Sequence, residues 1–274
     1  MRLYLTTDME GVAGVLDHDN WVMRDGCWYK TGVDLLTAET NAAIAGFRAG
    51  GFTDIVVMDG HGAGGIDPTA LDPDVELLRH APTPVYPWCL DEGFDAIAWV
   101  GQHAKAGTPM SHITHTGWFD VIDLSVNGIS IGEYGQFALC AKELGVPCIF
   151  AAGEQALCDE ATALTPGVET VAVKWGLKTD GLEHLTTDQY RNAKLAARHL
   201  SPTEARRRIA AGARRAAEAF VADRGRFRFP ELAPPYTLHR VTRGVAGGPI
   251  THSEATHPDS LIGVLNAPRH EVAR

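Results

Sequence analysis

Short apolar runs alternate with helix-length spacers along the first two thirds of the chain. The runs lie at residues 2–5, 55–58, 96–100, 148–152 and 168–173. Each stops at a small or polar residue and is short enough for a buried strand. Strands separated by helices in this way are typical of a largely parallel sheet. The pattern therefore predicts an α/β fold, a largely parallel sheet with helices on both faces.

Two of the spacers predict helices. Residues 33–49 place apolar side chains on one face and stop at a pair of glycines, and residues 133–144 also end at a glycine. Between the third and fourth apolar runs, residues 121–126 alternate in polarity before Asn127-Gly128. This dipeptide favours the tight turn of a β-hairpin.

The composition shifts toward arginine, alanine and polar residues after Lys174. A serine followed by proline opens a predicted helix at residues 201–220. Two further apolar runs, residues 236–241 and 261–265, are interpreted as strands. We expect an α/β metal-binding catalytic domain over residues 1–174 and a smaller C-terminal α+β lobe over residues 175–274.

Composition and charge narrow the classes of protein. Hydrophobic residues make up 45% of the chain and charged residues 21%, which is typical of a folded globular protein. The formal net charge of −10 and the lack of a basic patch predict no nucleic-acid partner. No apolar run reaches the ~18 residues of a membrane span, so no membrane partner is expected.

Cysteine usage indicates a reducing compartment. The five cysteines are odd in number and form no C-x-x-C pair, which disfavours a disulfide framework and a cysteine zinc site. A carboxylate at Asp8 interrupts the start of the chain, where a secretory signal would need an apolar stretch. We therefore expect a cytoplasmic protein.

Metal-ligating side chains follow directly after the predicted strands. Asp8 and Glu10 come after the first strand, His61 after the second and His103 after the third, while Glu133 opens a helix. Ligands in open α/β sheets gather at the carboxyl ends of the strands. This mixed nitrogen and oxygen set suits zinc, manganese or cobalt and can hold two ions.

Electrostatics favours the same interpretation. Three carboxylates gathered without a cation would repel one another and take up protons, whereas two divalent ions neutralise them. Asp8 and Glu10 stand two residues apart and so point to the same side of an extended segment. The alternative for each residue is an ordinary loop or capping role.

Other candidates are less specific. His112 and His115 lie in one loop, and either could serve the chemistry or be a solvent-exposed histidine. The glycine-rich residues 62–65 are interpreted as a flexible loop that lets the backbone approach the site. His252 and His257 could form a second metal site, although a polar loop explains them.

Several short motifs occur in a fixed order through residue 174. They lie at residues 7–11, 58–61, 101–109, 115–116, 126–128, 132–133, 145–147 and 152–153. In this order they resemble the zinc-dependent D-aminopeptidase family of the DppA type, peptidase family M55. The spacing between residues 108 and 115, and an insertion at residues 175–193, depart from the family pattern.

The resemblance implies roles for the residues that match the family motifs. It implies a catalytic histidine in the loop that bears His112 and His115. His115 fits this role better than His112, because Thr116 follows it and because His115 stands at the family-like distance before the Gly-Glu motif. Apart from the resemblance, Asp59 is a candidate for orienting the His61 ring from outside the ligand set. The resemblance also implies a centre of two zinc ions, with Mn²⁺ or Co²⁺ as alternatives, whose ligands are Asp8, Glu10, His61, His103 and Glu133.

The implied activity is hydrolysis of the N-terminal amide bond of short peptides or amino-acid amides, preferring D-residues, by a zinc-bridged hydroxide. The implied assembly is a homo-oligomeric ring, with a decamer as the family form. Two alternatives remain open from the residues. One is another di-metal hydrolase acting on a phosphoester or non-peptide amide, and the other is a non-catalytic metal-loaded peptide-binding protein.

Overall fold

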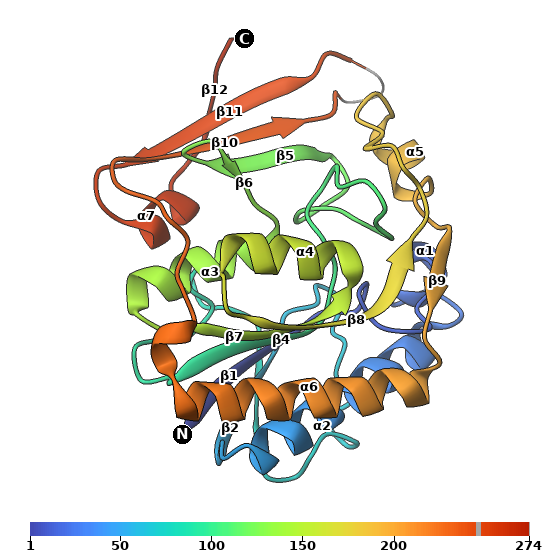
Figure 1. Cartoon of the computed structure of the whole chain (residues 1–274). Coiled ribbons are helices and arrows are strands. Elements are labelled where there is room, and N and C mark those ends of the chain that lie inside the picture. The colour runs from blue at the N-terminus through green and yellow to red at the C-terminus, as the bar shows by residue number, and fades with distance from the viewer. Residues whose placement is uncertain (245–247, 274) are drawn as a thin grey trace.

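The main sheet is built from the apolar runs, as the computed structural model shows for residues 1–244 and 248–273. Its strand order within these residues is β3-β2-β1-β4-β7-β8-β9 (Figure 1). Neighbouring strands are parallel except for β9, which pairs antiparallel with β8. The strands are β1 (Arg2–Thr7), β2 (Asp54–Asp59), β3 (Glu76–Arg79), β4 (Ala96–Gln102), β7 (Cys148–Glu154), β8 (Glu169–Gly176) and β9 (Ala197–His199).

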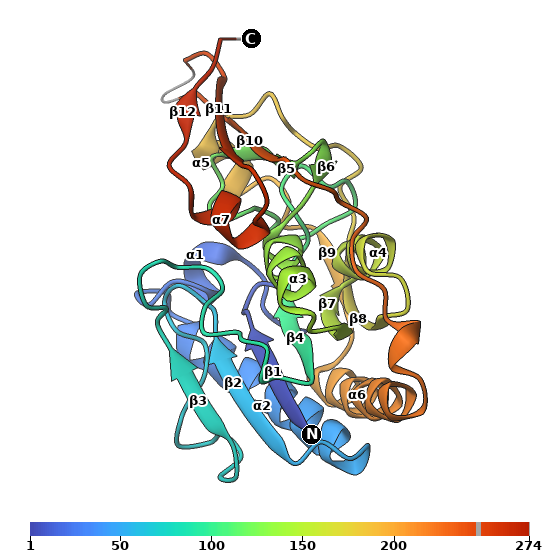
Figure 2. The same ribbon diagram turned by 90° about the vertical axis from the view of Figure 1, so that its left-hand side faces the viewer.

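Helices cover both faces of this sheet. The helices α2 (Tyr29–Ala49) and α6 (Pro202–Ala222) lie together on one face, and α3 (Glu133–Leu144) and α4 (Gln155–Leu164) lie on the other (Figures 1 and 2). Alternate strand residues feed two apolar cores, with Leu3 in one and Tyr4 in the other. The predicted fold class is confirmed.

A second, antiparallel sheet lies at the opposite end of the molecule from α6 (Figure 1). Its order is β12-β11-β10-β5-β6. The predicted hairpin joins β5 to β6 through Asn127 and Gly128, whose φ angles of 49° and 81° match a tight primed turn. The strands are β5 (Val121–Val126), β6 (Ile129–Ser130), β10 (Tyr236–Thr242), β11 (Thr251–His257) and β12 (His270–Glu271).

The two sheets do not divide the chain at residue 174. Strand β5, from the first part, pairs with β10 from the second. Conversely, β9 joins the main sheet and α6 packs against α2. The separate folding of residues 1–174 and 175–274 stays a prediction, but each range contributes to both sheets.

One predicted strand is wrong. Residues 261–265 belong to the helix α7 (Leu261–Asn266), because Ser260 accepts a hydrogen bond from Gly263 N and Glu143 accepts one from Ile262 N. The polar strand β11 was not predicted. The remaining elements are the short helices α1 (His18–Trp21) and α5 (Thr187–Arg191) and the 3₁₀ turn η1 (Arg224–Arg226).

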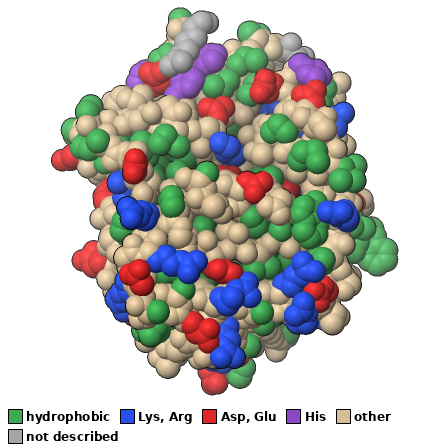
Figure 3. Space-filling view, viewed as in Figure 1, with side chains coloured by type: hydrophobic (Ala, Val, Ile, Leu, Met, Phe, Trp, Pro, Cys, Tyr) green, Lys and Arg blue, Asp and Glu red, His purple; other side chains and the backbone are tan. Residues whose placement is uncertain are grey.

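The arginine-rich face of α6 is exposed, and charges of both signs are mixed over this region (Figure 3). Arg207 and Arg208 both contact Glu204, and Arg214 contacts Glu218. These pairs describe a solvated helix face and not a one-sign patch. Within residues 1–244 and 248–273, no helix is long and apolar enough to cross a membrane.

Candidate metal centre

The sheet topology brings the candidate ligands together. Strand β1 lies between β2 and β4, so Asp8, His61 and His103 follow the carboxyl ends of three adjacent strands. The segment after β1 passes so close to β4 that a Cβ at Gly11 would lie 2.1 Å from the carbonyl oxygen of Gln102. Only glycine fits there. This close approach carries Glu10 back over the strand ends.

Three of the candidates form a first compact group. The ligand atoms of Asp8, Glu10 and His103 all lie within 4.8 Å of one another. His103 Nε2 is 3.2 Å from Asp8 Oδ2. His61 joins them, because its Nδ1 is 3.2 Å from Asp8 Oδ1 and 3.4 Å from Glu10 Oε2. All four side chains are buried.

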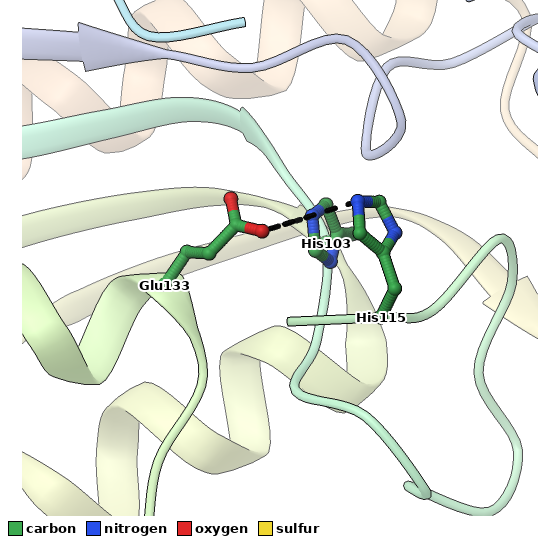
Figure 4. Close-up of side chains that lie close together, drawn as sticks. All are labelled: His103, His115 and Glu133. Atoms are coloured by element: carbon green, nitrogen blue, oxygen red, sulfur yellow. Dashed lines mark ion pairs between the residues drawn. The ribbon is translucent and has the colours of Figure 1, made fainter. Parts of the chain in front are cut away.

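A second group shares His103 with the first. Figure 4 shows Glu133 pointing from the start of α3 toward His103 and His115, whose rings stack with centroids 4.1 Å apart. The ligand atoms of these three residues lie within 4.8 Å of one another. Glu133 Oε1 is 3.5 Å from His103 Nε2 and 3.9 Å from His115 Nε2.

Each histidine turns one ring nitrogen to a backbone carbonyl. His61 Nε2 lies 3.1 Å from Val22 O, and His103 Nδ1 lies 2.8 Å from the carbonyl oxygen of Ala104. His115 Nδ1 lies 3.0 Å from the carbonyl oxygen of Ile113. A carbonyl oxygen only accepts, so these nitrogens carry the proton and the other nitrogen faces the carboxylates. This is the arrangement of metal-binding histidines.

The inner nitrogens then create an electrostatic conflict. Without a proton or a cation between them, lone pairs of histidine nitrogen and carboxylate oxygen face each other. Burial opposes charge at Asp8, but the neighbouring rings of His103 and His61 hold its pKa well below the usual value. Burial likewise opposes the positive form of His103, while Glu133 and Asp8 raise its pKa well above the usual value. The carboxylates therefore stabilise positive charge at this position, either a proton or a cation.

Two buried atoms test whether a metal fits. Within the described residues, Glu10 Oε2 and His103 Nε2 are buried without a hydrogen-bond partner. Unpaired buried polar atoms are costly, and both belong to the residues whose donor atoms cluster. A divalent cation satisfies both atoms and removes the lone-pair conflict. The donor set thus fits a metal.

The structure brings together all five predicted metal ligands and His115. Their role as ligands stays a prediction, but their proximity is a feature of the fold. Asp59 does not contact the His61 ring as suggested. Instead its Oδ1 accepts a hydrogen bond from Gly65 N, which holds the glycine-rich loop, and Arg79 donates to the carbonyl oxygen of His61.

His112 lies apart from the centre. Its Nε2 is 3.1 Å from Leu16 O, and its ring stands perpendicular to that of His199 at 5.2 Å. Burial, with Lys174 and His199 nearby, lowers the pKa of His112 to about 2. This imidazole is neutral at physiological pH and packs in the interior. Of the two loop histidines, His115 is the one whose ring faces the centre.

His252 and His257 do not share a site. They stand five residues apart on the extended strand β11, which separates their backbones by roughly 16 Å. His252 Nδ1 is 3.2 Å from His239 Nε2, whereas His257 Nδ1 accepts a hydrogen bond from Ser260 N. The second metal site considered from the sequence is therefore wrong.

The centre opens into a pocket of about 650 Å³. Sequence reasoning did not identify two of the polar residues on its wall, Gln102 and His18. Gln102 Nε2 donates to Asp8 Oδ2 at 2.9 Å, and its place beside His103 was the available signal. Apolar walls come from residues far apart in the sequence, Met23, Tyr86, Trp88, Trp118 and Phe137.

Comparison with known proteins shows the family of this chain. The family model for peptidase M55, described as D-aminopeptidase, matches residues 1–243. The chain belongs to peptidase family M55. A D-aminopeptidase of Bacillus subtilis (strain 168) is 31% identical over 191 residues, or 68% of this chain and 68% of that relative. The resemblance carried by the sequence motifs is confirmed.

A solved M55 structure shows the same fold. The Zn-dependent D-aminopeptidase DppA from Bacillus subtilis, a self-compartmentalizing protease, matches with a TM-score of 0.80 and 24% identity. The match covers 97% of this chain and 95% of that chain, so both sheets are included. At this identity the likeness establishes the architecture of this M55 chain.

A buried pair of ionisable groups lies behind the centre. Lys174 is fully buried, and its Nζ is 3.3 Å from Val15 O. Burial lowers its pKa to about 8, although Glu154 and Glu39 oppose that shift. Burial raises the pKa of Glu39 to about 8, although Ala13 N and Lys174 oppose it. The fold therefore holds a carboxyl group with a strongly raised pKa in its interior.

We predict that Glu39→Gln changes the pH dependence of stability. The pKa of Glu39 is about 8 when folded and near 4.5 when unfolded, so the folded state binds more protons between these values. Its contribution to the free energy of unfolding is full below about pH 4.5 and is lost as the pH rises through about 8.

Urea denaturation between about pH 5 and about pH 8 measures this effect. The wild type should lose stability relative to Glu39→Gln as the pH rises. The exposed carboxylate variant Glu143→Gln serves as the control and should show a constant offset. A constant offset for Glu39→Gln as well would contradict the prediction.

Proposed function

We propose that this M55 protein is a metal-dependent aminopeptidase that hydrolyses the N-terminal amide bond of short peptides or amino-acid amides. The observation that carries the proposal is the pair of overlapping donor groups sharing His103 at the base of a 650 Å³ pocket. A single carboxylate–imidazole pair would not explain why two groups of three donor residues share one histidine. Two donor groups in contact match a site for two ions.

We propose zinc as the metal, with two ions per chain. Asp8, Glu10 and His61 would hold one ion, Glu133 the other, and His103 lies between the groups. When bound, such ions polarise a carbonyl oxygen and lower the pKa of water toward neutrality. Support comes from the mixed imidazole and carboxylate donors, which suit zinc and also accept Mn²⁺ or Co²⁺.

We propose His115 as the catalytic histidine. Burial and the neighbouring His103 lower the pKa of His115, which favours its neutral imidazole. The proton sits on Nδ1, which faces the carbonyl oxygen of Ile113, and Nε2 is free toward the centre. A neutral Nε2 can take a proton from a reacting group and return it to the departing amine.

The pocket favours a peptide over a phosphoester. Among its described lining residues Arg24 is the only lysine or arginine, so a phosphate would find few cations beyond the metal. The acidic ligands instead suit an ammonium group. Trp88 and Phe137 offer apolar surface to side chains. We propose D-residues as the preferred substrates, supported by the family match.

We also propose a homo-oligomeric ring, with a decamer as the expected size, and a cytoplasmic location. Large apolar side chains are exposed, including Trp28 at 52% and, on the pocket wall, Trp118 at 40% and Met23 at 37%. Subunit contacts commonly cover such surfaces. All five cysteines are free, which suits a reducing compartment.

The first prediction concerns substrate class. D-alanyl p-nitroanilide and D-aminoacyl amides should be hydrolysed in the presence of zinc, manganese or cobalt, and the matching L-compounds more slowly. An aryl phosphate should remain intact, because the pocket offers few cations. Measuring kcat/KM for this panel tests the proposal. Tight peptide binding without cleavage would instead favour the binding-protein alternative.

The second prediction concerns the metal ligands. Glu10→Ala should reduce the zinc content below the expected two ions and lower kcat/KM by more than about 100-fold, because one donor and one buried negative charge are lost. Elemental analysis and circular dichroism separate metal loss from unfolding. Asp34→Ala, an exposed acid on α2, is the control. Full activity in Glu10→Ala would refute the assignment.

The third prediction separates the two loop histidines. His115→Ala should lower kcat by about 10²- to 10⁴-fold while zinc content stays unchanged, because its Nε2 acts on protons and not as the main ligand. His112→Ala should keep most turnover and lose stability. Steady-state kinetics and thermal unfolding test both variants. Turnover lost only in His112→Ala would show that the wrong histidine was chosen.

A further inference from the structure

We propose that Glu154 and Glu160 are positioning residues, which hold the segments bearing His103 and Glu133 and the loop bearing His115 through their backbone N–H groups. This inference rests on the proposed function, because it concerns the same centre. Neither carboxylate contacts the clustered donor atoms. Both come from one continuous unit, the end of β7 and the following helix α4.

Glu154 connects the end of β4 with the loop that carries His115. Its Oε1 accepts a hydrogen bond from Ala104 N, the residue after His103, at 2.7 Å. Its Oε2 accepts one from His112 N at 2.7 Å. The side chain is fully buried. One carboxylate therefore sets the distance between the strand end that bears His103 and the loop that bears His115.

Glu160 makes the same connection to α3. Its Oε2 accepts from Lys105 N and its Oε1 from Gly132 N, both at 2.9 Å. Gly132 is the N-cap of α3 and precedes Glu133, and it offers no side-chain cap. A Cβ at Gly132 would lie 3.0 Å from Glu160 Oε1 and 2.8 Å from Lys105 Cβ. The glycine thus lets this carboxylate reach the helix start.

The chemistry of these contacts requires a carboxylate. Each of the two side chains accepts N–H groups on both oxygens, whereas a glutamine side chain has only one acceptor oxygen. A glutamine in the same place would turn its NH₂ group toward one backbone N–H. Burial raises the pKa of Glu154, while the N–H group of Ala104 and the buried Lys174 favour its charged form. The substitution to glutamine keeps the volume and removes one of the two connections.

The four backbone hydrogen bonds to Glu154 and Glu160 control the geometry of the whole centre, because both donor groups share His103. A shift of either segment changes the spacing of both groups, and displacements of about 1 Å strongly reduce catalysis. Outer partners of metal ligands typically contribute about 10- to 100-fold in affinity or activity. We therefore expect losses of this size in metal affinity and in kcat, with little change in KM.

The test compares Glu154→Gln and Glu160→Gln with Glu143→Gln in the full-length protein. Glu143 also accepts backbone N–H groups, from Leu261 and Ile262, but at α7 and away from the centre. Zinc dissociation constants come from competition with a chromophoric chelator. The visible spectrum of the Co²⁺-loaded protein reports ligand geometry, and kcat and KM come from aminoacyl anilide hydrolysis.

We expect Glu154→Gln and Glu160→Gln to weaken zinc binding by about 10- to 100-fold, to alter the Co²⁺ spectrum and to lower kcat more than KM changes. Glu143→Gln should lower stability without these effects. Wild-type zinc affinity and Co²⁺ spectra in both test variants would overturn the inference. Equal effects in all three variants would also overturn it, since they would indicate general destabilisation.

The test remains decisive if one variant fails to fold or if the protein cleaves no aminoacyl substrate. Glu160 is only partly buried, so Glu160→Gln carries the test alone if Glu154→Gln does not fold. Zinc affinity is measured independently of turnover. A wild-type protein that binds zinc and cleaves no aminoacyl substrate would refute the proposed aminopeptidase activity, while the zinc affinities of the variants would still decide the positioning roles.

Discussion

The repulsion among three carboxylates at one point of the fold is the constraint on which the site depends. Asp8 and Glu10 are buried, and Glu133 lies on the other side of their shared neighbour His103, at the start of α3. Burying like charges together is costly unless positive charge compensates them. The imidazoles of His61 and His103 reduce this repulsion either by taking up protons or by binding a cation together with the carboxylates. Their carbonyl-bound outer nitrogens favour the shared cation.

The parallel sheet makes this concentration of charge possible. Strands β2, β1 and β4 end side by side, so their following residues meet without long loops. Glu133 arrives from the opposite direction, because the hairpin β5–β6 returns the chain to the start of α3. The same helix start places a partial positive charge next to this carboxylate. The backbone therefore offsets part of the repulsion before any ion binds.

The sequence predicted what local pattern determines and missed what tertiary contacts determine. Helix α3 has its predicted bounds, because Gly145 takes the left-handed φ of 71° that ends a helix. The five candidate ligands were identifiable because they follow apolar strands. In contrast, β11 buries only Ala255 and shows no clear alternation, and the apolar run at 261–265 is too short to separate strand from helix. His112 and His115 look alike in sequence, and only their long-range contacts distinguish them.

Those long-range contacts also show why the C-terminal part of the chain belongs to the site. Arg243, just after β10, is buried and donates to the carbonyl oxygens of Phe119 and Val121, on the chain that follows His115. It also donates to Leu185 O. Lys194 donates to Ser111 in the loop that bears His112 and His115. Residues beyond 175 thus contact this loop and the chain that follows it. Contacts from Arg243 and Lys194, far along the chain, therefore fix the loop in which His115 Nε2 faces the centre.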